Sequence, residues 1–184
     1  MNEIITGIGP KNTIEKLWKV TSIGGYEADH SLTIDISKRY IIYCWVYKDE
    51  LVSSDICTFA YGIQGAVLKN SDGSSQVDPK FINNGVFSPS GNLNSYVGEW
   101  LLSIGFIFPS TTVNTATTYS GIYDLSGERV LEGIDYRWSA DPTPWAGETI
   151  LQGNSSSEVL YIARPSIYEY DSVKGPFIEN ILGI

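Results

Sequence analysis

The stretch GEWLLSIGFIFPS, residues 98–110, holds a run of large apolar side chains that only Ser103 and Gly105 interrupt. The run is far shorter than the roughly 20 residues that a membrane-spanning helix needs. Glycine and proline punctuate the stretch, which disfavours a soluble helix. Both alternating rows of its side chains are largely apolar, which is typical of a strand covered on both faces. We therefore predict a central strand over 99–108 in a two-layer β structure.

The rest of the chain has the same character. Residues 39–47, RYIIYCWVY, are rich in the β-branched and aromatic types that favour strands. Glycine-rich turns separate shorter candidate strands, and no long helical period occurs. The sequence therefore predicts an all-β fold, an antiparallel β-sandwich of jelly-roll type. The shorter candidate strands are 17–23, 31–36, 56–62, 64–69, 120–124, 128–132, 134–138, 148–152, 158–163 and 166–171, and a short helical turn is expected around 177–182.

The length of 184 residues suits one domain with short arms. We expect an N-terminal arm at 1–16, the jelly-roll sandwich at 17–175 and an apolar C-terminal segment at 176–184. Both ends carry apolar side chains that either cover the domain itself or contact a partner or further copies of the chain, with a trimer as one expected form. The expected assembly contacts are Ile4, Ile5, Ile8, Phe177, Ile181 and Leu182.

The net charge of −9, from 12 basic and 21 acidic residues, argues against nucleic acid and anionic membrane surfaces as partners. Neutral glycans and other proteins remain open. The N-terminus has neither the basic start nor the long apolar core of a secretory signal. We therefore expect synthesis in the cytoplasm without a signal peptide.

Four stretches together resemble a β-sandwich domain found near the ends of phage and prophage tail-fibre proteins. They are KRYIIYCWVYKD (38–49), GEWLLSIGFIFPS (98–110), SGIYDLSGERVLEGIDYRW (120–138) and ARPSIYEYDSVKGPFIENILG (163–183). That domain is similar in architecture to jelly-roll carbohydrate-binding modules. The resemblance implies a non-enzymatic virion protein, as a fibre, decoration or host-attachment component, that contacts other virion proteins and host-surface glycans. It places the chain in the phage particle.

Sequence signals for catalysis are weak. The single histidine, His30, lies in no recognisable triad, no serine has the G-x-S-x-G surround of a hydrolase elbow, and no nucleotide-binding loop occurs. The alternating acids Glu27 and Asp29, or Glu169 and Asp171, are the only candidates for a glycosidase pair. We expect no catalytic residues, and a small polysaccharide-active enzyme is the last of three interpretations.

No cofactor is expected, with calcium as the one metal that the sequence could accommodate, because its carboxylates supply the oxygen ligands that calcium prefers. The calcium candidates are Glu27, Asp29, Asp35 and Asp171. Cys44 and Cys57 could face each other if 39–47 and 55–61 formed a hairpin, although successive jelly-roll strands often lie in different sheets. We favour two reduced, buried thiols.

A glycan surface is expected in 119–148, where aromatic rings that can stack on sugars lie close in sequence to hydrogen-bonding side chains. Trp145 is the leading candidate because two prolines stiffen its loop, SADPTPWAG; the alternatives are that it plugs one end of the sandwich or contacts a protein. The full candidate set is Trp145, Trp138, Tyr136, Tyr119, Tyr123, Asp141 and Glu148. A free-standing carbohydrate-binding module is thus the second interpretation, beside the virion component.

Overall fold

The computed structural model describes residues 3–21, 24–31, 33–49, 58–64, 67–69, 73, 86–87, 93–112, 119–140, 148–154 and 159–170. In β3, β5, β6, β7 and β12 the backbone alone is described. Within these residues the only helical element is the short 3-10 turn Pro10–Asn12, and no helix is long and apolar enough to cross a membrane. The strands are β1 (Glu3–Ile8), β2 (Ile14–Val20), β3 (Gly24–Ser31), β4 (Arg39–Lys48), β5 (Thr58–Gln64), β6 (Val67–Lys69), β7 (Val86–Phe87), β8 (Trp100–Phe108), β9 (Gly121–Tyr123), β10 (Arg129–Glu132), β11 (Tyr136–Trp138), β12 (Glu148–Asn154) and β13 (Leu160–Tyr170).

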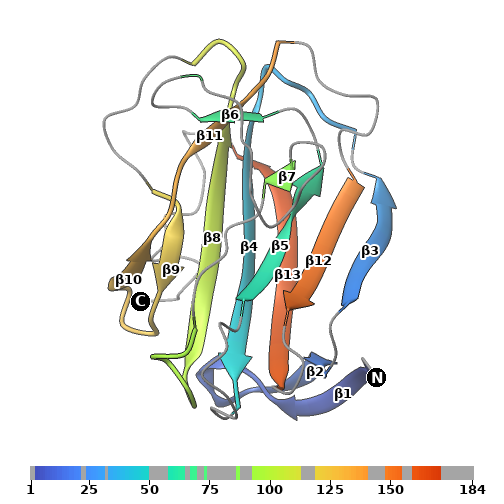
Figure 1. The fold of residues 1–184 in the computed structure, drawn as a ribbon, viewed down its shortest axis with the longest axis vertical. Helices are drawn as coiled ribbons and strands as arrows, with labels where there is room; N and C mark the ends of the chain where they lie inside the picture. Colours follow the sequence, from blue (N-terminus) through green and yellow to red (C-terminus); the bar gives the residue numbers. More distant parts are fainter. Residues whose placement is uncertain are drawn as a thin grey trace.

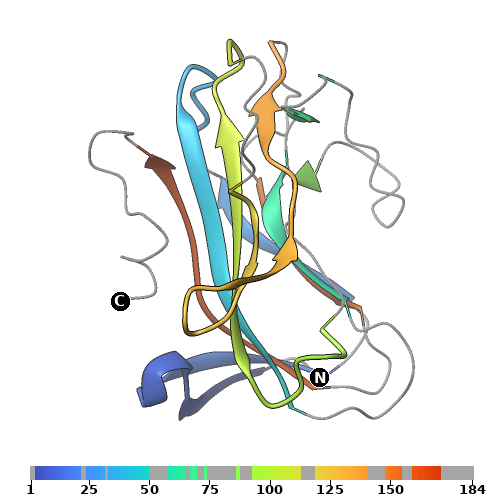
Figure 2. The same ribbon diagram turned by 90° about the vertical axis from the view of Figure 1, so that its left-hand side faces the viewer.

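The described strands form two sheets that stack face to face (Figures 1 and 2). The large sheet has the order β1-β2-β13-β4-β8-β11-β6, with β9 beside β8 and β10 beside β9, and the small sheet has the order β3-β12-β5-β7. Pairing is antiparallel except between β8 and β11. From β2 to β8, successive strands alternate between the large and the small sheet, which is typical of a double-sheet jelly roll. The expected all-β, jelly-roll-like sandwich is confirmed.

Strand β8 is central, as predicted from its sequence. It pairs with β4 on one side and with β9 and β11 on the other. Every residue of 101–108 is buried. Because both faces of this strand are covered, an alternation of polar and apolar side chains would place polar groups in the interior, and the sequence is accordingly apolar in both rows.

The large sheet carries an apolar cluster on each face. The inner cluster, between the two sheets, contains Val20, Tyr40, Ile42, Cys44, Val46, Leu93, Leu101, Ile107, Ile122, Tyr136, Trp138, Leu160 and Ile162. The outer cluster contains Leu17, Ile41, Trp45, Leu102, Ile104, Phe106, Phe108, Tyr123 and Ala163, with Ile5 packed against it. The β1–β2 hairpin supplies Ile5 and Leu17 and projects from the side of the large sheet that faces away from β3, β12 and β5 (Figure 2).

The N-terminal residues differ from the expected arm. Residues 3–20 form a hairpin whose second strand pairs with β13, so they extend the large sheet, and the part of the chain before residue 17 is not separate from the sandwich. The cause is the alternating pattern of EIITGI and IEKLWKV, which places Ile5 and Leu17 on the face toward the outer cluster.

Other strand boundaries also differ. Residues 33–38 are not in a strand, and the strand before them ends at Ser31. The predicted strands 158–163 and 166–171 are one strand, β13, with a bulge between Ala163 and Ser166. Asp35 accepts hydrogen bonds from the backbone N and Oγ of Ser37, a turn geometry that ends extended structure here. The C-terminal segment 176–184 and its expected helical turn lie outside the described residues.

Cys44 is a free, buried thiol in the inner cluster, and burial raises its pKa. Strands β4 and β5 lie in different sheets, so the hairpin that would place Cys57 opposite Cys44 does not form. Cys57 itself lies outside the described residues.

Candidate functional site

An open cavity of about 850 Å³ lies where the large sheet meets the β1–β2 hairpin. The hairpin forms one wall, the turn between β9 and β10 forms another, and the ends of β13, β4 and β8 form the floor. Hairpin and turn lie on the same side of the large sheet, away from the small sheet (Figure 2). The described lining residues are Ile5, Gly7, Ile8, Asn12, Leu17, Tyr47, Asp49, Gly98, Glu99, Trp100, Asp124, Leu125, Ser126 and Tyr161.

The floor of the cavity is a row of three aromatic side chains, one from each of three neighbouring strands. Tyr161 of β13 is the register partner of Tyr47 in β4, and Tyr47 is the register partner of Trp100 in β8. The Tyr47 and Trp100 ring centroids lie 5.3 Å apart, and those of Tyr47 and Tyr161 lie 6.0 Å apart. All three rings are partly buried. Cross-strand pairing therefore builds an aromatic row, Tyr161-Tyr47-Trp100, that the cavity leaves accessible.

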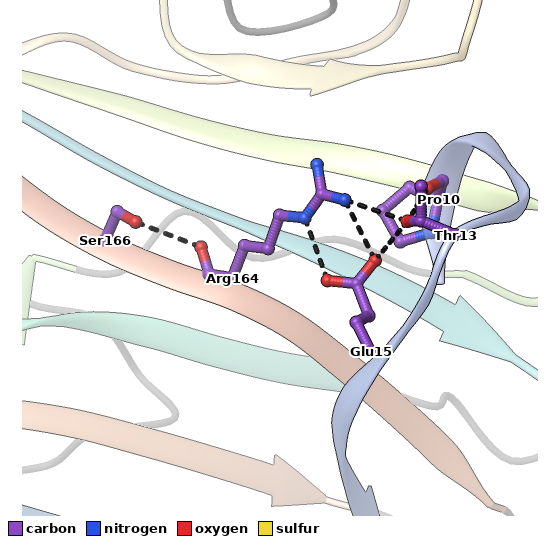
Figure 3. Close-up of polar contacts among 5 residues, drawn as sticks. All are labelled: Pro10, Thr13, Glu15, Arg164 and Ser166. Carbon is purple, nitrogen blue, oxygen red and sulfur yellow. Dashed lines mark hydrogen bonds and ion pairs between the residues drawn. The ribbon is translucent and has the colours of Figure 1, made fainter. Parts of the chain in front are cut away.

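A two-point ion pair fixes the hairpin wall to the sheet (Figure 3). The Nε of Arg164 donates to Oε2 of Glu15 at 2.8 Å, and its Nη2 donates to Oε1 at 3.0 Å and to Thr13 Oγ1 at 3.0 Å. Thr13 Oγ1 also lies 2.8 Å from Glu15 Oε1 and 3.1 Å from the Pro10 carbonyl oxygen. Bidentate guanidinium–carboxylate pairs restrict orientation as well as distance. This clamp, Arg164-Glu15-Thr13, therefore holds the tip of the hairpin over β13.

The bulge in β13 puts Arg164 in position for the clamp. Residues 164 and 165 interrupt the register between Ala163 and Ser166, and Arg164 has a φ of 51°. A positive φ is uncommon outside glycine and marks a conformation that its surroundings impose. The Ser166 hydroxyl donates to the Arg164 carbonyl oxygen at 3.2 Å (Figure 3). Bulges redirect side chains, and here the bulge turns the guanidinium toward the hairpin.

The opposite wall is a tight turn organised by Asp124. One oxygen of its carboxylate accepts hydrogen bonds from Ser126 N at 2.8 Å, Ser126 Oγ at 2.7 Å and Glu128 N at 3.0 Å. The hydrogen bond from the Ser126 hydroxyl is the main cause that lowers the pKa of Asp124, and the backbone donors add to it. The turn therefore presents Leu125, which is 46% exposed, beside a carboxylate that keeps its charge.

Two more carboxylates, Asp49 and Glu99, lie beside the aromatic row. Both residues are exposed. Burial of the Tyr161 phenol, with the negative charge of Asp49 and a hydrogen bond to it, raises the pKa of Tyr161. Its hydroxyl is therefore a neutral donor at physiological pH. The cavity combines ring faces, hydroxyl donors and carboxylate acceptors, which is the set of groups that binds polyhydroxylated molecules.

The expected glycan surface in 119–148 is not assembled as a surface by the described residues. Trp138 is fully buried in the inner cluster, where it makes an edge contact with Tyr40 at 5.7 Å between ring centroids. Tyr136 and Tyr123 are also buried, and the Tyr123 hydroxyl donates to the Tyr119 carbonyl oxygen at 2.6 Å. These three rings offer no face to a sugar, because short strands of the large sheet direct them into the two clusters.

The remaining glycan candidates are spread over several parts of the molecule. Tyr119 is 46% exposed and packs against Phe106. Glu148 begins β12 in the small sheet, where only its backbone is described. Asp141 and Trp145 lie outside the described residues, so the leading sequence candidate stays a prediction.

The calcium candidates are not brought together by the described side chains. Asp35 is satisfied by Ser37, whose hydrogen bonds are the main cause that lowers its pKa. Glu27 and Asp29 lie in β3, where only the backbone is described, and Asp171 lies outside the described residues. In the part of the chain that can be searched, no three His, Cys, Asp or Glu side chains come close enough to hold a metal ion.

The expected assembly contacts divide between two surfaces. Ile4 and Ile8 are 74% and 65% exposed on the outer face of the hairpin, together with Ile14 at 80%. Ile5 points the other way and lines the cavity, and Ile8 also borders the cavity at the hairpin tip. Phe177, Ile181 and Leu182 lie outside the described residues.

Sequence analysis alone misses the aromatic row. Tyr47 and Trp100 sit in strongly apolar strand patterns, which favours a core position, and Tyr161 is far from both in sequence. The charged residues near these two aromatic residues are a sequence signal that could have indicated their exposure. Tyr47 is followed closely by Asp49 and Trp100 is preceded by Glu99, so both aromatic residues lie where a strand reaches solvent.

Comparisons with known proteins add little to this geometry. No family model matches the chain, and no curated protein matches it. A similar solved structure is that of the botulinum neurotoxin serotype G binding domain, with a TM-score of 0.42 and 11% identity over 92% of this chain. The match spans 44% of that chain. A likeness at this level carries no argument about function, and nothing in these comparisons is specific to phage.

Proposed function

We propose that this chain is a non-catalytic carbohydrate-binding module whose binding site is the cavity between the hairpin and the Asp124 turn. The aromatic row is the observation that carries the proposal. Sugar rings present apolar C–H faces that stack on aromatic rings, and hydroxyls that need donors and acceptors close by. Tyr161, Tyr47 and Trp100 supply the stacking surface, and the surrounding carboxylates and tyrosine hydroxyls supply the polar partners.

Pre-organisation supports the same proposal. The strand register fixes the spacing of the three rings, and the clamp of Arg164 and Glu15 fixes the hairpin wall. A ligand that enters this cavity orders few additional groups, so less conformational entropy is lost on binding.

The test measures how two variants bind to an array of neutral, cationic and acidic oligosaccharides. Each variant removes one exposed or partly exposed aromatic side chain. Trp100→Ala removes one ring of the row, and we expect binding to weaken by roughly tenfold or more. Tyr119→Ala is the matched control, because Tyr119 is exposed but does not line the cavity. Loss of binding with Tyr119→Ala and not with Trp100→Ala would move the site to the region first expected from sequence.

A second variant protects the test against misfolding. Leu125 lies on an exposed turn, so Leu125→Arg places a bulky side chain at the cavity rim without removing a core contact. We expect it to reduce sugar binding with an unchanged melting temperature. If wild-type protein binds no oligosaccharide on the array, the proposal is wrong.

We further propose that the module acts as a component of a phage particle, assembled with other virion proteins and copies of itself. The four sequence stretches that resemble tail-fibre domains support this proposal, as do the exposed isoleucines Ile4, Ile8 and Ile14 on the hairpin. A free-standing module without an assembly role is the alternative, and self-association through the hairpin distinguishes the two.

An enzymatic function has less support. Glu169, one of the two acids that a glycosidase could use, forms an ion pair with Lys38 at 2.8 Å and does not line the cavity. Asp171 lies outside the described residues. Within the cavity, the Asp124 carboxylate is held by its own turn, and Asp49 is engaged by Tyr161. Hydrogen-bonded acids of this kind fit binding better than proton transfer.

A further inference from the structure

The charge around the aromatic row is one-sided. Three carboxylates, from Asp49, Glu99 and Asp124, are among the described lining residues, and those residues include no lysine, arginine or histidine. A cleft lined by charges of one sign concentrates its field on a bound ligand. The described part of the cavity lining therefore carries a net negative charge.

The charge of Asp124 persists at neutral pH. The pKa of Asp124 is lowered, with the Ser126 hydroxyl as the main cause, so this carboxylate stays ionised. One base near the row is Lys19, the register partner of Tyr161 in β2. Its positive charge acts on the Tyr161 phenol less strongly than the negative charge of Asp49 does, and its ammonium forms an ion pair with Glu3 at 3.3 Å.

Aromatic rings act in the same direction as the carboxylates. The face of a tryptophan or tyrosine ring is electron-rich and attracts cations, and several rings placed together bind ammonium groups well. Tyr47 and Trp100 are inclined at 45° and Tyr47 and Tyr161 at 61°, so the three rings are not parallel. Because these rings and the three carboxylates line one cavity, a positively charged group bound there lies near both kinds of group.

We propose that the ligand of this cavity carries a positively charged amino group, as an amino sugar with a free ammonium does, and that the cavity disfavours acidic sugars. The inference rests on the proposed sugar-binding role. It goes further because a neutral glycan would satisfy that role without using the carboxylates.

The experiment is calorimetric titration of the full chain, at mildly acidic pH, with three oligomers of equal length: glucosamine, N-acetylglucosamine and galacturonic acid. We expect the glucosamine oligomer to bind at least about tenfold more tightly than its acetylated form, which corresponds to ~1.4 kcal/mol. The galacturonic acid oligomer is expected not to bind. Added salt should weaken the first interaction selectively, because it is electrostatic.

A charge-matched pair of variants separates a specific site from general attraction, since a chain of net charge −9 attracts any polycation. Glu99→Gln removes a lining carboxylate, whereas Glu132→Gln removes an exposed carboxylate that does not line the cavity. We expect only Glu99→Gln to reduce the preference for the glucosamine oligomer. Equal effects of the two variants would overturn the inference.

The outcomes also separate this inference from the proposed function. Equal or tighter binding of the N-acetylglucosamine oligomer, sensitive to Trp100→Ala, would overturn the inference and leave the sugar-binding proposal intact. Binding of none of the three oligomers would overturn the inference, and together with a negative array it would overturn the proposed function as well.

Discussion

Arg164 and Glu15 are joined through two hydrogen bonds, although Arg164 lies in the bulge of β13 and Glu15 lies far away in sequence, in the N-terminal hairpin. The Arg164 Nε and Nη2 atoms lie 2.8 and 3.0 Å from the two carboxylate oxygens of Glu15. Gly9 makes the approach feasible, because a side chain at that position would collide with the Glu15 carboxylate. The hairpin is thus fixed to the sheet by a specific contact as well as by strand pairing.

The first prediction concerns the strength of this contact. In a double-mutant cycle with Arg164→Gln and Glu15→Gln, we expect a coupling free energy of about 1 kcal/mol, because the pair is bidentate and the Glu15 side chain is largely buried. Urea unfolding of the four proteins measures it. The ion pair of Lys38 and Glu169 is the control: both side chains are about half exposed, so its coupling should be smaller. Equal couplings for the two pairs would show that the bidentate geometry adds nothing.

The second prediction is a dependence of stability on acid. Burial raises the pKa of Glu15, but the hydrogen bonds from Arg164 and Thr13 and the Arg164 charge outweigh it, so the folded pKa lies below the ordinary value of 4.5. The stabilisation is therefore fully present above pH 4.5 and is lost as pH falls through the folded pKa. Melting temperatures measured across this range should fall less steeply in Glu15→Gln than in wild type. Parallel curves would contradict a lowered pKa.

Asp135 supplies a third prediction, on stability apart from the cavity. Its buried carboxylate accepts hydrogen bonds from Ser120 N at 2.8 Å and from Tyr119 N at 3.1 Å. These bonds hold the backbone of the two residues that precede β9. Asp135→Asn weakens the acceptor for these amides, and we expect a loss of about 2 kcal/mol in the free energy of unfolding. Sugar binding per folded molecule should be unchanged, because Asp135 does not line the cavity.

The pH dependence at Asp135 has the opposite sign to that at Glu15. Burial, the largest cause, raises the pKa of Asp135, and the hydrogen bonds from Ser120 and Tyr119 only partly oppose it. The folded protein therefore binds this proton more tightly than the unfolded chain does, so its contribution to stability declines as pH rises from 3.8 through the folded pKa. Asp135→Asn should remove that decline, and a variant curve with the same decline would place its origin elsewhere.

The central strands could be predicted from sequence because a strand that is buried on both faces has apolar residues at nearly every position. In β8 and β4, nearly every side chain is buried, and no polar residue is needed on a solvent face. The N-terminal hairpin is harder to predict, because β1 and β2 alternate only partly. The pairing of β2 with β13 depends on a strand that lies almost the whole chain away.

The cavity could not be predicted because it depends on register. Tyr161, Tyr47 and Trp100 share a row only when β13, β4 and β8 pair with one particular offset, and a shift by one residue would turn their side chains to the other face. The clamp depends in addition on the bulge at Arg164, which no local pattern marks. Conversely, sequence proximity grouped Tyr123, Tyr136 and Trp138, which the fold buries in two different clusters.

The last prediction concerns assembly through the hairpin. Ile4, Ile8 and Ile14 are among the most exposed large apolar side chains of the described residues, and Ile8 and Ile14 are cross-strand partners. Within the described sheets, β1 pairs with β2 alone, and Glu3 is its only charged residue. An apolar edge strand with little charge favours pairing with another chain. We therefore expect the full chain to associate in solution as concentration rises.

Substitution of all three isoleucines by threonine keeps the β propensity of the hairpin while removing most of the apolar surface. We expect the mass measured by light scattering to fall to that of a monomer. Ile134→Thr is the control, because Ile134 is 45% exposed but lies outside the hairpin. Point substitutions are sharper than deletion of residues 1–16, which would also remove Glu15 and with it the clamp. A wild-type chain that stays monomeric at every concentration, or an assembly that survives the triple substitution, would exclude the hairpin as the contact between copies.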